Sequence, residues 1–326
     1  MSKSIVLPDA KEPRHDDGHG LDATAPAEVP AKGWKDVALR VKDDLRNDHT
    51  SLSAAGVAFF GFLAFIPALA AVISVYGLIA EPADVQSRMQ DLFTALPTDA
   101  RELLTDQITR LTERSGSSLG IGLVISVAIA LWSASSGMAH LLEAINIAYG
   151  EQDERGPVAQ RGMALIMTIG VLVVVGVAAT GFAAASTLGD SNEALRWIVR
   201  LATWAVAAAL FVGVLAVLYR HGPDRDEPRW RWVSPGAMAA LVGWLLITVG
   251  FGIYVSNFGS YDETYGSLAS IVILLFWLYL SAFVVILGAE LNSELEHQTA
   301  RDSTQGAEQP LGTRDAEVAD TVGVRS

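Results

Sequence analysis

Three polar residues at regular spacing lie near the end of an otherwise apolar stretch, and they are the first candidates for chemistry. His140, Glu143 and Asn146 follow one another at intervals of three, so a helix would place them on one side. An ionisable group within an apolar helix is a functional candidate by default. Two interpretations stay open: a polar face that transfers protons, or a His140–Glu143 pair across one turn near the helix end.

A second group of polar residues lies in the segment SNFGSYDETYGS, between two apolar stretches. Its two adjacent carboxylates would attract a cation or an amine, which suggests an entry site or gate. The alternative is an interfacial turn with a tyrosine belt, which membrane proteins place there routinely. The residues concerned are Asn257, Tyr261, Asp262, Glu263 and Tyr265, beside Gly259 and Gly266.

Small hydroxyl residues form a third candidate, in the sequence LWSASSGMAH. The hydroxyls of Ser133 and Ser136, next to the large ring of Trp132, would line a polar path through a helical bundle. The alternative is close helix packing, which favours Gly, Ala and Ser because the backbones can then approach.

A single carboxylate, Glu290, follows 26 charge-free residues, 264–289. It either marks the cytoplasmic end of a membrane span or forms a buried ion pair with Arg220 or Arg231. We favour the ion pair, because an unpaired buried charge is costly. Pro67 lies inside another apolar stretch, where a proline removes one backbone hydrogen bond and usually kinks a helix.

The elements that position these residues are visible in the distribution of charge. The chain has 326 residues with 23 Lys or Arg and 36 Asp or Glu, yet six stretches contain none of these four types. A membrane-crossing helix needs roughly 20 apolar residues, and backbone groups in lipid must be bonded internally. The pattern therefore predicts an all-α polytopic membrane protein with six transmembrane helices. The charge-free stretches are 49–80, 115–142, 162–189, 201–219, 232–261 and 264–289.

The domain organisation follows from the same pattern. We expect a disordered cytoplasmic tail over 1–31, a six-helix membrane domain over 32–298 and a second disordered cytoplasmic tail over 299–326. Short amphipathic helices are predicted at 33–48, on the membrane surface, and in the long first extracytoplasmic loop, 80–117. The expected spans are about 52–79, 118–149, 161–187, 194–219, 235–256 and 267–296.

Composition also limits function. Lys and Arg near the helix ends favour the side that holds both termini, which predicts that both termini are cytoplasmic. Signatures of enzymes are missing from the sequence: there is no HExxH motif, no nucleotide-binding P-loop and no cysteine. We expect no enzymatic activity, no cofactor, no metal site and, because no basic surface is present, no nucleic-acid partner. The expected partners are the lipid bilayer and a small-molecule or lipid substrate of unknown identity, and association of several copies of the chain stays open.

Four blocks of sequence resemble the YihY/BrkB family of bacterial inner-membrane proteins, long mislabelled as a ribonuclease. They are SAAGVAFFGFLAFIPAL at 53–69, LWSASSGMAHLLEAINIAYGEQDER at 131–155, YRHGPDRDEPRWRWVSPGA at 219–237, and the long block at 254–296 that begins YVSNFGSYDETYGS. The resemblance implies six helices with cytoplasmic ends, and a role as a transporter or, in one pathogen branch, in resistance to serum killing. After GEQDER, where the family usually has a more basic run, this chain reads GPVAQR.

Two functions are consistent with these observations. The first is a transporter or permease in the cytoplasmic membrane, supported by the polar residues within apolar helices and by Pro67. The second is a non-transporting envelope protein that scaffolds partners or supports envelope integrity. A polar cavity that reaches Ser133, Ser136 and Tyr265 would favour transport, and apolar packing there would favour the scaffold.

Overall fold

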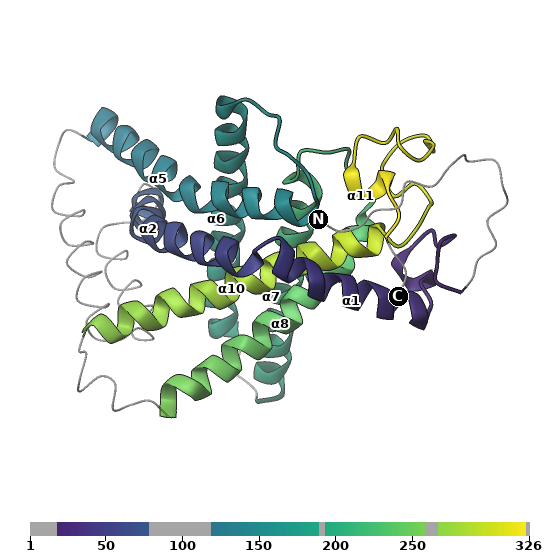
Figure 1. Ribbon diagram of the computed structural model, residues 1–326. Helices are drawn as coiled ribbons and strands as arrows, with labels where there is room; N and C mark the ends of the chain where they lie inside the picture. Colours follow the sequence, from purple (N-terminus) through teal and green to yellow (C-terminus); the bar gives the residue numbers. More distant parts are fainter. Residues whose placement is uncertain (1–17, 78–118, 189–192, 258–266, 324–326) are drawn as a thin grey trace.

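The computed structural model describes residues 18–77, 119–188, 193–257 and 267–323, and within these ranges its regular structure is helical. One isolated antiparallel bridge joins Pro228 to Thr304. The elements are η1 (Pro26–Glu28), α1 (Ala31–Asn47), α2 (Thr50–Gly77), α5 (Leu119–Ala148), α6 (Pro157–Leu188), α7 (Glu193–His221), α8 (Trp230–Asn257), α10 (Ser267–Glu296) and α11 (Glu317–Asp320) (Figure 1).

Six long helices, α2, α5, α6, α7, α8 and α10, occupy the six predicted spans. Four of them, α6, α7, α8 and α10, are long and apolar enough over their described residues to cross a membrane. The described apolar part of α2, Thr50–Ala64, is shorter. Over its described residues the chain is therefore all-helical, with four candidate membrane spans. The short helices predicted in the first loop lie outside the described residues.

The helix ends follow from local chemistry. Gly150 ends α5 with a φ of 68°, a conformation that glycine adopts without a steric penalty. The amides of Gly150 and Glu151 then donate to the carbonyls of Ile147 and Asn146, at 2.9 Å each, which is the Schellman arrangement. At the start of α6, Pro157 takes a first-turn position whose missing N–H costs nothing.

The start of α8 differs from the sequence prediction. The helix begins at Trp230, and Pro235 lies inside it rather than at its start. The side chain of Asn292 on α10 supports this first part of α8: its Oδ1 accepts the Gly236 amide at 2.7 Å, and its Nδ2 donates to the Val233 carbonyl at 3.0 Å. Local sequence does not reveal a contact from a side chain 56 residues away, which is why the span was predicted to start only at about residue 235.

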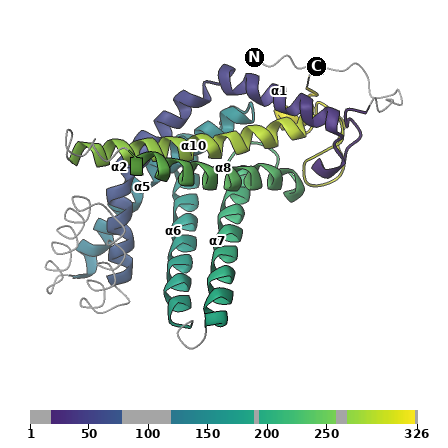
Figure 2. The same cartoon turned by 90° about the horizontal axis from the view of Figure 1, so that it is seen from below.

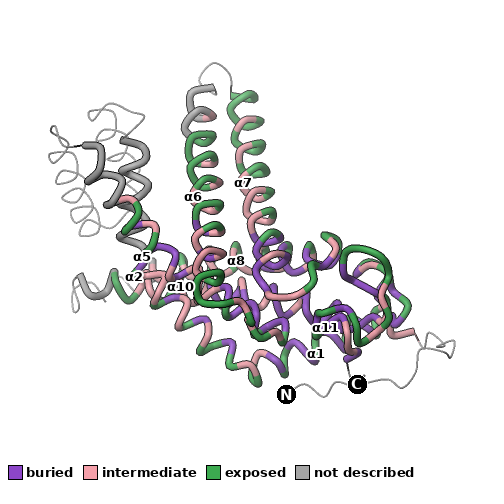
Figure 3. The backbone as a smooth tube through the Cα atoms, turned by 90° about the horizontal axis from the view of Figure 1, so that it is seen from above, coloured by how far each residue is buried: buried purple, intermediate pink, exposed green. Residues whose placement is uncertain are grey.

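The helices form two parts that differ in exposure. Figure 2 shows α10 running beside α8, with α1 and α2 crossing them, while α6 and α7 project away from this layer as an antiparallel hairpin. Figure 3 shows that the hairpin is mostly exposed and that buried residues gather where it meets the layer. We call the buried end of the molecule the base; it is made by α1, the C-terminal half of α10, the connection 222–229 between α7 and α8, and the terminal segments.

Small residues let the helices of the layer pack closely. A Cβ on Gly236 of α8 would lie 2.0 Å from the Gly288 carbonyl oxygen on α10, and a Cβ on Gly137 of α5 would lie 3.1 Å from the Cα of Gly61 on α2. Large side chains fill the core between these contacts, and Tyr149, Tyr219 and Trp232 are among the largest fully buried ones.

The terminal segments are ordered where the structure describes them, in contrast to the predicted disorder. Thr299 donates to the carbonyls of Leu21 and Ala23, at 3.0 and 2.7 Å, and the Ala300 amide donates to Leu21 at 2.9 Å. These bonds join residues from 18–31 to residues from 299–323. The prediction from composition fails here because long-range hydrogen bonds hold these segments and because several of their apolar side chains, among them Leu21, Val29 and Val318, are buried.

Candidate functional site

The base contains a group of ionisable side chains that α1 and α10 place face to face. On α1, Arg40 and Asp44 are four residues apart, and on α10 the same spacing separates Glu290 from Glu294, so each pair lies on one side of its helix. Arg40 Nε donates to the Glu294 carboxylate, and its Nη2 donates to the Glu294 carbonyl at 3.1 Å and to Gln298 Oε1 at 2.8 Å. All five side chains are buried.

Four carboxylates lie close enough to influence one another: Asp44, Asp48, Glu290 and Glu294, which we call the carboxylate cluster. Burial, followed by the nearby charge of Glu294, raises the pKa of Asp44 to about 8. Burial also raises the pKa of Asp48. Asp44 therefore holds its proton at a pH where exposed carboxylates have lost theirs.

Glu290 is the least accessible of the four, with 1% of its surface exposed. The structure gives it a hydrogen bond from the Thr50 hydroxyl at 3.3 Å. The predicted ion pair with Arg220 or Arg231 is wrong, because Arg220 instead bonds Glu227 at 2.9 Å and Arg231 is exposed. Glu290 is thus a buried carboxyl group held by a hydroxyl, an arrangement compatible with a protonated acid.

A second buried network lies next to the cluster. Arg225 Nη2 donates to Glu296 Oε2 at 2.7 Å, with both side chains fully buried, and Ser303 donates to the same oxygen at 2.8 Å. The guanidinium of Arg225 lies over the ring of Tyr149, 5.1 Å from its centroid. One nitrogen of Arg225, Nη1, and one oxygen of Glu296, Oε1, are buried without a hydrogen-bond partner.

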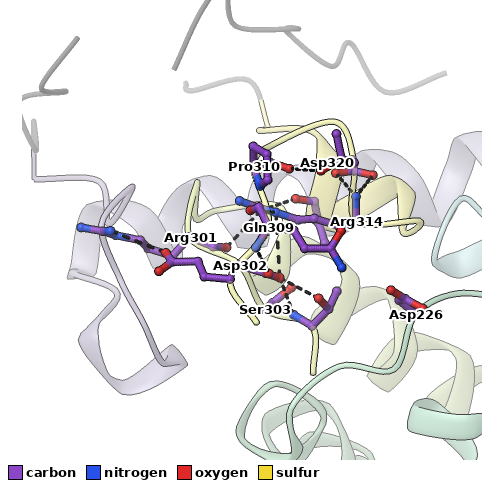
Figure 4. Close-up of polar contacts among 12 residues, drawn as sticks. Asp226, Arg301, Asp302, Ser303, Gln309, Pro310, Arg314 and Asp320 are labelled. Atoms are coloured by element: carbon purple, nitrogen blue, oxygen red, sulfur yellow. Dashed lines mark hydrogen bonds and ion pairs between the residues drawn. The ribbon is translucent and has the colours of Figure 1, made fainter. Parts of the chain in front are cut away.

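The C-terminal segment is built around a buried arginine (Figure 4). Arg314 is 3% exposed and donates to the carbonyls of Ala319 and Ala300 at 2.6 and 3.0 Å. Farther along, Thr321 lies 3.1 Å from His297 Nε2, and the Gly323 amide donates to the His297 carbonyl at 2.8 Å. The segment therefore covers the end of α10 next to the carboxylate cluster.

Of the residues selected on α5, His140 and Glu143 form the local pair that was one of the two interpretations. Their side chains are 3.3 Å apart, Glu143 is largely exposed, and the His140 ring stacks on Phe60 at 3.8 Å between centroids. Asn146 has a separate role. It is buried, and its Oδ1 accepts the backbone amide of Asp224 at 2.8 Å.

The serine patch is packed between helices. Arg161 of α6 donates to the Ser136 hydroxyl at 3.1 Å and to the Trp132 carbonyl, and its guanidinium lies 4.4 Å from the centre of the Trp132 ring. Ser135, fully buried, donates to the same carbonyl at 2.8 Å. Ser133 is partly buried. These contacts, together with the close approach of Gly137 to α2, agree with a packing role.

The remaining predicted residues are placed less completely. Tyr261, Asp262, Glu263 and Tyr265 lie outside the described residues. Asn257 is the last residue of α8, and Pro67 lies within α2, but their side chains are outside what the structure describes. The gate in this loop and the kink at Pro67 stay predictions.

A cavity of about 410 Å³ lies between α6 and α7, away from the base. Its wall is apolar apart from one threonine, and it includes neither Ser133 nor Ser136. In the part of the chain that the structure describes, no group of three or more His, Asp or Glu side chains is arranged to hold a metal ion.

Sequence reasoning missed the basal ion pairs. Arg40 and Glu294 are 254 residues apart, and Arg225 and Glu296 are 71 apart, so no local motif joins them. A usable signal did exist in the four-residue spacing of Arg40 with Asp44 and of Glu290 with Glu294. Such spacing identifies charged residues on one helical face that a partner helix can bury.

Comparison with known proteins gives consistent similarities. The family model described as virulence factor BrkB matches residues 41–312. The ribonuclease-like protein YfkH of Bacillus subtilis is 30% identical over 251 residues, which cover 74% of this chain and 88% of that protein. The membrane protein azo3165 of Azoarcus is 28% identical, over 74% of this chain and 59% of its own length.

A third relative, the membrane protein PBPRA3489 of Photobacterium profundum, is 24% identical over 84% of each chain. No solved structure matches this chain significantly.

Proposed function

The chain belongs to the family of the virulence factor BrkB, and from this premise we propose that it is a six-span permease of the cytoplasmic membrane, gated by protonation of the carboxylate cluster. The single observation that carries the proposal is Glu290, a carboxyl group 1% exposed on an apolar helix and bonded by a hydroxyl. Ionisable groups kept inside membrane helices are expensive and typically mark proton relays or substrate paths.

The topology is the first part of the proposal. Besides the four candidate spans, α2 and α5 have 28 and 30 residues of strongly apolar composition, enough for one crossing each. Six crossings place both termini on one side. The excess of Lys and Arg in the segments on that side supports a cytoplasmic location for them.

The gating step is the second part. With Asp44 and Glu290 protonated, Arg40 and Glu294 form the charged pair that remains between α1 and α10. Loss of those protons would leave several carboxylates close to one arginine, and like charges in a site of low polarity repel strongly. Deprotonation would therefore weaken the α1–α10 contact and favour a second arrangement of the two helices.

Proteoliposomes that contain the full chain test this proposal. Pools of metabolites and lipid-soluble compounds are added across a pH gradient, and charge movement is recorded on a solid-supported membrane. We expect one pool to give a pH-dependent current that Glu290→Gln abolishes and Glu143→Gln, at an exposed site, leaves intact. Amide hydrogen exchange of α1 and α10 at pH 6 and pH 8 supplies a second readout. We expect the exchange of both helices to be faster at pH 8 in wild type and to be the same at both pH values in Glu290→Gln.

One observation favours the alternative, an envelope scaffold that transports nothing. The serine patch on α5 is occupied by Arg161 and by close packing against α2, so it offers no polar path there. Absence of current for every pool, together with identical exchange at both pH values, would favour the scaffold.

The proposal includes no ribonuclease activity, although one relative is named ribonuclease-like. Cleavage of RNA by the purified protein, with contaminating nucleases excluded, would contradict this part of the proposal.

A further inference from the structure

The cavity between α6 and α7 has the length and chemistry of a site for one hydrocarbon chain. Its wall comes from residues 177–185 of α6 and 199–210 of α7, which at 1.5 Å per residue extend about 12 and 16 Å. Half of the hydrocarbon core of a bilayer is about 15 Å deep. The lining residues are Val177, Ala178, Gly181, Phe182, Ala185, Val199, Ala202, Thr203, Val206, Ala207 and Leu210.

Small side chains create this space. Five of the lining residues are Ala or Gly, and a Cβ placed on Gly181 would meet nothing within 4 Å. The hydroxyl of Thr203 donates to the Val199 carbonyl of its own helix at 2.7 Å, so it does not need a hydrogen-bond acceptor from a bound molecule. The ring of Phe182 meets that of Trp204 edge-on, 5.8 Å between centroids, and links the two helices. The wall therefore offers apolar contact and no polar anchor.

Positive charge lies beside one end of the cavity. Arg196 and Arg200 are exposed on the first turns of α7, and on an ideal helix Arg196 lies on the same face as Val199 and Thr203, about one turn nearer the tip. The guanidinium of Arg200 lies over the Trp197 ring, 5.3 Å from its centroid. Glu193, the acidic residue in the first turn of α7, lies roughly 110° around the helix from the centre of this face.

This arrangement complements an anionic amphiphile. An exposed Trp and two arginines suit the headgroup layer, where cations attract acidic lipid phosphates, and the apolar cavity begins one turn further in. We propose that the groove between α6 and α7 binds one acyl chain of an anionic phospholipid, with the phosphate at Arg196 and Arg200. This inference does not depend on transport.

Native mass spectrometry of the full chain in detergent, with added phosphatidylglycerol or phosphatidylcholine, tests the site. We expect wild type to retain one phosphatidylglycerol through washing. Gly181→Leu fills the groove and should lose it. The matched control is Gly176→Leu, at a glycine that also has open space around it but does not line the cavity, and it should retain the lipid. Equal thermal stability of the two variants establishes that both are folded.

A second experiment tests the contact between the lipid headgroup and the two arginines. The double variant Arg196→Gln, Arg200→Gln should lower the preference for phosphatidylglycerol over phosphatidylcholine about 25-fold, the combined effect of two basic residues near an anionic surface. Arg231→Gln, at an exposed arginine of α8, should leave the preference unchanged. Retention of lipid by Gly181→Leu, or equal retention of both lipids by wild type, would overturn the proposal. So would a change of oligomeric state in Gly181→Leu at constant lipid content, since a second copy would then be the occupant.

Discussion

The base and the α6–α7 hairpin differ in which side chains they bury: the base buries charged side chains, and the hairpin exposes apolar ones. In the base, Arg225 and Glu296 have no exposed side-chain surface and bond each other. In the hairpin, Leu201 and Ile166 are 75% and 67% exposed, and 17% of the most apolar window of each helix is buried. One part of the chain places charge inside protein, and the other presents hydrocarbon to its surroundings.

The difference is the one expected of a membrane protein, in which water and lipid act on different parts of one chain. Water competes for charged groups, so charges taken into the base need partners, which come from α1, α10, the connection 222–229 and the terminal segments. Lipid has no competing hydrogen bonds, so apolar residues of the hairpin need no protein cover. The hairpin would be costly to expose to water, at about 25 cal/mol for each Å² of apolar surface.

The largest expected effect comes from removing one member of the buried ion pair. Arg225→Ala should lower the free energy of unfolding by about 3–5 kcal/mol, because Glu296 is left charged and without its partner. Thermal or denaturant unfolding in detergent measures the loss. Arg231→Ala, at an exposed arginine, should change little, and the double variant Arg225→Met, Glu296→Leu should recover most of the stability. A loss equal to that of Arg231→Ala would contradict a structural role for this pair.

A charge placed on the hairpin tests whether lipid surrounds it. Val173 is 58% exposed near the middle of α6, and Val173→Arg should cost about 2.5–3.5 kcal/mol of apparent insertion free energy if hydrocarbon lies against it. Val158, 88% exposed in the first turn of α6, is the matched control, since Arg is tolerated at the headgroup layer. Glycosylation-site mapping of insertion measures both. Equal insertion of the two variants would place the hairpin in water.

Two glycine substitutions compare a close helix–helix contact beside the base with the open surface of the hairpin, and their expected effects are smaller. Gly236→Ala should destabilise the fold by about 1–3 kcal/mol, because the added Cβ meets the Gly288 carbonyl oxygen at 2.0 Å. Gly213→Ala in α7, where a Cβ meets nothing within 4 Å, should instead stabilise by about 0.5–1 kcal/mol through helix propensity. Unfolding of both variants under one condition gives the comparison, and a change of the same sign in both would contradict it.

The smallest effect concerns protonation in the base. The pKa of Asp44 is raised to about 8 from an ordinary 3.8, so the folded protein holds a proton that the unfolded chain releases, and stability falls as pH rises from about 4 to 8. Asp44→Asn removes this dependence. We expect the variant to gain about 1 kcal/mol over wild type at pH 8, on the scale of one buried polar group, with no gain at pH 4. Unfolding at pH 4, 6 and 8 measures it, and parallel curves for the two proteins would contradict the raised pKa.

The positions of the long helices could be predicted from the sequence, but the contacts between them could not. The ends of α10 were predicted at 267 and 296 and are Ser267 and Glu296. The charge-free stretch 264–289 marks the body of this helix, which continues through Glu290 and Glu294 to its end. The start of α8 was missed by five residues because a contact from Asn292 is not visible in local sequence. The order in residues 299–323 was missed for a related reason, since Arg314 is held by backbone carbonyls that composition does not reveal.

The candidate site divides in the same way. His140 and Glu143 are three residues apart, and their pairing follows from helix geometry alone. Glu290 was selected correctly as a buried carboxylate, but its partner was not, because the choice between Thr50 and an arginine depends on how α2 packs against α10. Asp44 was not selected, since a charged residue on an amphipathic helix is normally on the wet side.

The bond between Arg40 and Glu294 also has a consequence for biogenesis. The ribosome makes Arg40 before Glu294, with 254 residues between them, which at about 5–20 residues per second takes roughly 13–50 s. Throughout that interval α1 lacks the contacts that α10 supplies, so its docking is complete only after the last long helix is made. Chains truncated before Glu294 would insert their helices but would leave α1 without its contacts to α10 and accessible to proteases. The packing of the base therefore becomes complete only when synthesis of α10 is complete.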